Sequence, residues 1–147
     1  MILKLQIIED PELEDTEISI KCPKIDDTID KISDIIRSFY IRILVKKDNE
    51  SIIINVDEIY YFEFVDNRLF AYTKDEIYEV NYKLHELVNL LSKASFIQTS
   101  RTILLNINKI KSVQALVNGR IMAVFDNGEK TIITRVYAGD FKRKIKE

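Results

Sequence analysis

Two Asn-Gly pairs in the last third of the chain constrain its fold more than any other feature. Asn118-Gly119 and Asn127-Gly128 each lie between runs rich in β-branched residues. Asn and Gly tolerate the positive φ angles that both central positions of a tight hairpin turn require. The runs at 110–117, 120–126 and 129–135 are therefore predicted to form an antiparallel meander.

Two-residue turns of a similar kind recur in the middle of the chain. Asp48-Asn49 and Asp66-Asn67 each separate two short runs rich in apolar and aromatic residues. Turn residues between short β-rich runs are typical of hairpins and argue against alternating strand–helix units. The further strands that this pattern predicts are residues 41–47, 51–55, 60–65, 68–73, 76–80, 96–100 and 102–105.

Helices are expected at few positions in this part of the chain. Apolar residues at helical spacing predict a helix over residues 82–92, with Asn81 as its N-cap. The basic end of the chain, 137–146, is expected to be a short helix or a tail. The fold class is therefore mainly β (α+β), with about ten short strands and one or two helices.

Residues 1–40 are expected to form a strand–helix attachment to a domain at 41–147. Runs at 2–8 and 16–22 are predicted to be short strands. Apolar residues spaced three and four apart predict a helix over 25–39, capped by Asp26 or Asp27. The apolar face of that helix must bury against the domain or a second copy, so the attachment is a candidate dimerisation or regulatory element.

The charge of the chain is divided unevenly. Residues 96–147 hold ten Lys or Arg against four Asp or Glu, a net of +6, whereas residues 1–95 hold twelve against twenty, a net of −8. Such asymmetry within a chain of formal net charge −2 is a reason to expect a nucleic-acid partner.

The sequence lacks the residue patterns of enzymes and metal sites. Its single histidine, His85, lies on the predicted helix, where a structural role is more frequent than catalysis. Three glycines do not make a phosphate-binding loop, and one cysteine, Cys22, rules out an internal disulfide and a cysteine metal cluster. We expect no enzymatic activity, no metal and no cofactor, in a cytoplasmic protein without a signal peptide or a membrane span.

The aromatic residues at 60–65 allow two interpretations. They could form a stacking surface for single-stranded nucleic acid, which is normally basic. Glu58, Glu63 and Asp66 interleave with them, so packing in the core is expected instead.

Two arginines lie where the chain changes direction. Arg101 follows a predicted strand, and Arg135 ends the last one. Loop edges commonly present binding residues, and arginine can bind both guanine edges and phosphates. Lys109, Lys111 and Arg120 could add contacts to phosphates, or could simply be solvated.

Residues from 41 to the end resemble a LytTR DNA-binding domain. The resemblance covers over two thirds of the chain in the right order. The segments that carry it are 56–63 (VDEIYYFE), 83–87 (KLHEL), 96–106 (FIQTSRTILLN), Ile110, 118–120 (NGR), 127–129 (NGE) and 134–135 (TR).

The resemblance implies an elongated β-β-β fold whose loops enter successive major grooves of promoter DNA, with two copies at paired sites. It implies base contacts from Asn67, Arg101 and Arg135. The phosphate contacts expected with them are Arg68, Ser100, Lys109, Lys111 and Arg120. Asp66 departs from the family pattern, because a carboxylate beside a phosphate is repulsive.

Many family members carry a phosphoacceptor receiver domain, which 40 residues do not hold. The chain is similar to the short stand-alone regulators, and an inhibitory membrane protein is an expected partner for that subgroup. The rival interpretation is a protein-interaction or small-ligand-sensing β domain that does not bind DNA.

Overall fold

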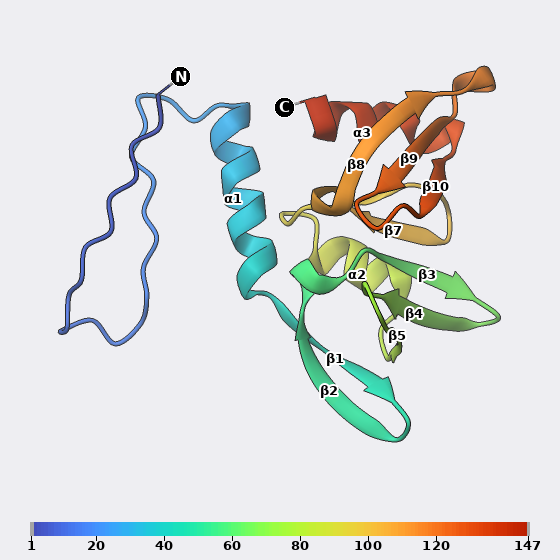
Figure 1. The fold of residues 1–147 in the computed structure, drawn as a ribbon, viewed down its shortest axis with the longest axis horizontal. Helices are drawn as coiled ribbons and strands as arrows, with labels where there is room; N and C mark the ends of the chain where they lie inside the picture. Colours follow the sequence, from blue (N-terminus) through green and yellow to red (C-terminus); the bar gives the residue numbers. More distant parts are fainter. Residues whose placement is uncertain (1, 147) are drawn as a thin grey trace.

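The computed structural model describes residues 2–146, which form three α-helices and ten strands in two antiparallel sheets (Figure 1). The strand count and the mainly β class expected from the sequence are confirmed. The strands are β1 (Arg42–Lys47), β2 (Glu50–Asn55), β3 (Tyr61–Val65), β4 (Arg68–Tyr72), β5 (Ile77–Val80), β6 (Phe96–Gln98), β7 (Ile103–Asn106), β8 (Ile110–Ala115), β9 (Ile121–Phe125) and β10 (Lys130–Ile133). The helices are α1 (Asp27–Tyr40), α2 (Leu84–Leu90) and α3 (Arg135–Lys146).

Tight turns set the order of the strands in each sheet. The larger sheet runs β2-β1-β5-β4-β3-β7-β6, and the smaller one runs β10-β9-β8 as the predicted meander. At Asp48-Asn49 and Asp66-Asn67 both residues have positive φ, between 50° and 67°. Asn118 and Gly119 also both have positive φ, at 61° and 74°. At the second Asn-Gly pair only Gly128 does, because its N–H bonds to the carbonyl of Phe125 and makes a longer turn.

The core has two parts. One part lies between α2 and the larger sheet, where Leu87 and Leu91 pack among buried residues that include Phe62 and Leu104. The other lies between the smaller sheet and α3, and Phe141 of that helix is fully buried there. Each helix therefore covers a sheet face whose alternate residues are apolar.

The aromatic strand joins the two sheets. The expectation that it packs in the core is confirmed for Tyr60 and Phe62, which are buried, whereas Phe64 is 41% exposed. The ring of Tyr61 stacks between those of Tyr72 and Phe125, at centroid distances of 4.4 and 5.7 Å. Its hydroxyl donates to a Glu129 carboxylate oxygen at 2.7 Å, and the Tyr60 hydroxyl donates to Asp126. Burial and the Asp126 carboxylate raise the pKa of Tyr60 to about 12.

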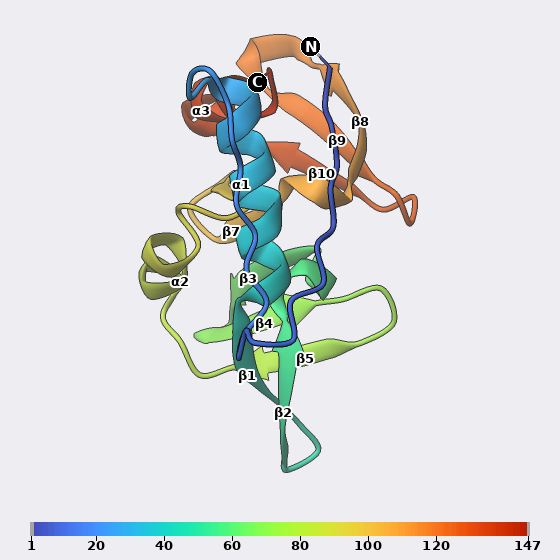
Figure 2. The same cartoon turned by 90° about the vertical axis from the view of Figure 1, so that its left-hand side faces the viewer.

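The helix expected in the attachment is present, but its two expected strands are not. Asp26 caps α1 by accepting the N–H of Ile29 at 3.1 Å. Residues 2–25 form an extended arm that contains no helix or strand. The arm runs along the outer side of α1 (Figure 2). Neither run of the arm is paired with a strand of either sheet, so its backbone lacks the hydrogen bonds that define a strand. The domain boundary at residue 40 stays a prediction.

Two helix limits differ from those expected. α2 begins after Lys83, whose N–H bonds to the side chain of Glu86 at 2.9 Å, so Asn81 is not its cap. The basic end is a helix, and α3 begins at Arg135, where a strand end was expected. The N–H of Tyr137 already bonds to the carbonyl of Thr134, which turns the chain into the helix early.

Candidate nucleic-acid interface

Three loops predicted to bind DNA lie next to one another. They are the β3–β4 turn with Asn67, the β6–β7 loop with Ser100 and Arg101, and the junction of β10 and α3 with Arg135. The β3–β4 tip and the start of α3 both lie on the side of the molecule opposite α1 (Figure 1). This side is free of the N-terminal attachment.

Two backbone hydrogen bonds hold the loops side by side. The N–H of Phe64 donates to the carbonyl of Thr102 at 2.9 Å, which ties the β3–β4 hairpin to the β6–β7 loop. The N–H of Thr134 donates to the carbonyl of Thr99 at 3.0 Å, which ties the same loop to the start of α3. Arg101 therefore lies in the middle loop, braced on both sides by backbone bonds and not by mobile side chains.

Both candidate base-reading arginines are exposed, and neither has an ion-pair partner within residues 2–146. Arg101 follows Ser100, whose hydroxyl accepts the N–H of Thr102 at 3.2 Å and so shapes the loop. Arg135 lies against the β8–β9 turn, because a Cβ added to Gly119 would be only 2.8 Å from its Cγ. That contact also brings Arg120 close to the third loop.

Arg68 is held more firmly than the other candidates. Its guanidinium makes two hydrogen bonds to the Glu79 carboxylate, at 2.7 and 3.0 Å, and lies 5.4 Å from the centre of the Phe70 ring. The pair raises the pKa of Arg68 and lowers that of Glu79. A charged guanidinium is thus fixed beside Asn67, with part of its charge already neutralised.

Asn67, Arg68 and Arg101 line one groove of about 730 Å³. Lys83 and His85 of the α2 region also line it. Reasoning from the sequence did not select these two, since their strongest signal was position on an amphipathic helix. Their place in the groove depends on how α2 packs across the larger sheet.

Lys109 and Lys111 are not brought to the three loops. Arg101 precedes β7, whereas Lys109 follows it, so the two lie at opposite ends of that strand. The Lys109 ammonium lies 5.3 Å from the centre of the Tyr60 ring. Burial raises the pKa of Asp57, and the charge of Lys109 opposes part of that rise. These contacts give Lys109 a role in packing.

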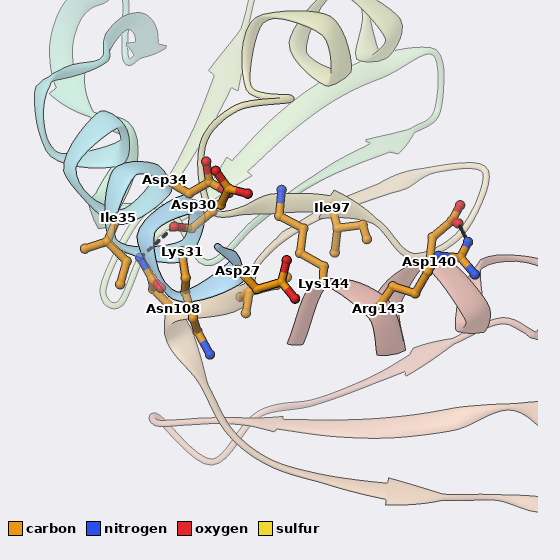
Figure 3. Close-up of a pocket in the computed structure, with 12 residues that line it drawn as sticks. Asp27, Asp30, Lys31, Asp34, Ile35, Ile97, Asn108, Asp140, Arg143 and Lys144 are labelled. Atoms are coloured by element: carbon orange, nitrogen blue, oxygen red, sulfur yellow. Dashed lines mark hydrogen bonds and ion pairs between the residues drawn. The ribbon is translucent and has the colours of Figure 1, made fainter. Parts of the chain in front are cut away.

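A second hollow, of about 380 Å³, lies between α1 and α3 (Figure 3). Asp30 and Asp34 of α1 lie on one side of it, and Lys144 of α3 lies on the other. The Lys144 ammonium donates to the carbonyls of Ala94 and Phe96, both at 2.9 Å, and its burial lowers its pKa. The hollow marks where α1 docks on the domain, away from the three loops.

The described residues hold no cluster of His, Cys, Asp and Glu suited to a metal ion. Among residues 2–146, no helix is long and apolar enough to span a bilayer.

Comparison with known families matches residues 49–146 to the model of the LytTr DNA-binding domain. The chain belongs to the LytTR family. The resemblance stated from the sequence is thereby confirmed, and the matched LytTR segment contains all three loops and the groove.

Named relatives agree with this assignment. The Sensory transduction protein LytT of Enterococcus faecalis is 27% identical over 89 residues, which are 60% of this chain and 37% of that protein. The Transcriptional regulatory protein YpdB of Escherichia coli is 26% identical over 98 residues, which are 66% of this chain and 40% of that protein. The chain thus matches about two fifths of the length of these LytTR relatives.

A solved structure shares the LytTR fold. It is the LytTr DNA-binding domain of a putative methyl-accepting/DNA response regulator from Bacillus cereus, with a TM-score of 0.67 and 25% identity. The match covers 71% of this chain and 95% of that one. The mostly β architecture with antiparallel sheets is therefore that of a known LytTR domain.

Proposed function

We propose that this LytTR protein binds specific sequences of double-stranded promoter DNA and regulates transcription as two copies at paired sites. Asn67, Arg101 and Arg135 read base edges in successive major grooves. Arg68, Ser100 and Arg120 bind phosphates beside them. Lys109 and Lys111 contribute less than expected from the sequence, because they lie at the other end of β7.

The pair of backbone bonds to Thr99 and Thr102 is the observation that carries this proposal. A base-reading side chain discriminates between sequences only if its loop is held in place, because misplacement by about 1 Å weakens a bidentate contact. These bonds also make the β6–β7 loop a direct neighbour of both other loops, which supports joint binding to one duplex.

The rival small-ligand interpretation has less support. It used the aromatic strand as the wall of a pocket, but Tyr60 and Tyr61 pack between the sheets with their hydroxyls bound to carboxylates. Tyr60 and Tyr61 line neither of the two larger hollows, whereas Phe64 of the same strand lines the groove of about 730 Å³ together with the candidate DNA-binding residues.

The test is DNA binding by variants, after the preferred sequence has been selected from a random duplex pool. Arg101→Ala should lose roughly 5- to 150-fold in affinity for that sequence while keeping its affinity for unrelated duplex, since a bidentate base contact contributes about 1–3 kcal/mol of discrimination. Arg120→Ala should weaken both duplexes alike and lower the salt dependence by about one phosphate contact.

Arg143→Ala is the matched control, because Arg143 is exposed on α3 about two turns beyond Arg135. It should bind the selected duplex as the unmodified protein does. If Arg101→Ala and Arg135→Ala both discriminated normally between the two duplexes, the assignment of base reading to these loops would be wrong.

A further inference from the structure

The N-terminal arm, residues 2–25, exposes apolar side chains that nothing in the same copy covers. Ile2, Leu5 and Ile7 are 88%, 89% and 86% exposed. Figures 1 and 2 place the arm outside α1, so that this helix lies between the arm and the domain. Ordering an extended segment is unfavourable unless it buries surface, so the arm needs a partner.

The two runs of the arm differ in their surroundings. Ile18 and Ile20 of the second run lie beside α1 and line a hollow of about 300 Å³ with Ile36 and Tyr40. The first run, residues 2–8, does not line this hollow. Leu3, Leu5 and Ile7 lie on one face of the extended chain, whereas the other face has Lys4 and Gln6 in its middle. Such alternation is typical of a strand with one covered face.

The larger sheet has an edge that suits such a strand. β2 ends the sheet and pairs only with β1 among the described strands, so one side of its backbone is free for pairing. Ile53 of β2 and its partner Leu44 of β1 lie opposite each other and are 62% and 48% exposed. An edge strand with apolar neighbours is a template for an added strand.

Charge matches the arm to this edge. The turn between the two runs of the arm, residues 9–15, holds five carboxylates and no basic residue. Arg42 and Lys46 are exposed on β1, on either side of Leu44. A strand added next to β2 would bring the acidic turn of the arm near one of these cations, of which Lys46 already lies opposite Glu79 of β5.

We propose that residues 2–8 of one copy add as a strand to the β2 edge of a second copy, and that reciprocal exchange closes a two-fold dimer. A second copy is the fitting occupant because every copy carries both the unpaired strand and the unpaired edge.

The mass of the protein in solution, measured by sedimentation or light scattering without DNA, tests the proposed dimer independently of the proposed DNA contacts. The full chain should have twice the monomer mass. Leu5→Asp and Ile53→Asp should each shift it to the monomer mass at the same concentration. Ile132→Asp is the control, since Ile132 is an exposed residue on β10, an edge strand of the smaller sheet, and should leave the dimer intact.

A cross-link between two variants locates the contact. Leu5→Cys and Ile53→Cys, each combined with Cys22→Ser, are purified separately, mixed and treated with a short bis-maleimide. A linked dimer should form in the mixture and not in either variant alone. A full chain that stays monomeric, a dimer unaffected by both aspartate variants, or a mixture that does not cross-link would overturn the proposal.

Discussion

Gly119 allows a test of the loop arrangement, because it contacts the Arg135 side chain without being one of the proposed DNA-binding residues. Its φ is +74°, and an added Cβ would lie 2.8 Å from the Cγ and 3.1 Å from the Cδ of Arg135. Ordinary carbon–carbon contacts are about 3.5–4.0 Å. Gly119→Ala must therefore displace the Arg135 side chain by about 1 Å.

Gly128 provides a control with the same backbone cost. Its φ is +88°, and an added Cβ would meet nothing within 4 Å. A non-glycine residue in this conformation costs about 1–2 kcal/mol. Gly119→Ala and Gly128→Ala should therefore both lower the melting temperature by roughly 2–8 °C.

Only Gly119→Ala should weaken binding to the selected duplex. The loss is bounded by the contribution of the Arg135 contact, about 1–3 kcal/mol, or roughly 5- to 150-fold in Kd. Fluorescence anisotropy with labelled duplex measures it. Combining Gly119→Ala with Arg135→Ala should add no further loss. Equal affinities of the two glycine variants would refute the idea that the β8–β9 turn positions Arg135.

Three further predictions concern the scaffold. Asn106→Ala should lower the free energy of unfolding, measured in urea, by about 1–3 kcal/mol. The fully buried Asn106 amide donates to the Ile59 carbonyl at 2.9 Å, and the substitution removes this hydrogen bond. Lys109→Ala should cost about 0.5–1 kcal/mol of stability, because the contact between the ammonium and the Tyr60 ring is lost. NMR titration of the variant should also find the pKa of Asp57 higher than in the unmodified protein. An unchanged pKa would contradict the interaction between Lys109 and Asp57. The pKa of Tyr60 is raised from 10.0 to about 12, so the stability that its proton contributes is present below pH 10 and lost as pH rises towards 12. Denaturation measured between pH 10 and pH 12 should show a smaller loss of stability for Tyr60→Phe than for the unmodified protein.

Three of the tight turns and the start of α1 could be read from short stretches of sequence. Asp48-Asn49, Asp66-Asn67 and Asn118-Gly119 adopt positive φ because their own side chains permit it, whatever packs around them. Asp26 caps α1 through a bond to an N–H three residues away. Such local features depend only on residues that are neighbours in the sequence. The positions of the strands could therefore be predicted from the turns between them.

In the N-terminal arm the strands predicted from the sequence are absent. Its alternating residues have the pattern of strands, but a strand exists only when its backbone finds a neighbour. No sequence pattern states whether that neighbour is within the same copy. The runs at 2–8 and 16–22 are therefore extended without being strands.

The sequence alone determined the strands of residues 42–133, most of their turns, the helix of the attachment and the family. Only the tertiary structure decided which basic residues share a surface. Arg101 joins Asn67 and Arg135 because the Phe64–Thr102 and Thr134–Thr99 bonds pair segments that are about 35 residues apart in the chain. Lys109, only eight residues from Arg101, is carried to the other end of β7, because an extended strand separates its ends by about 3.3 Å per residue.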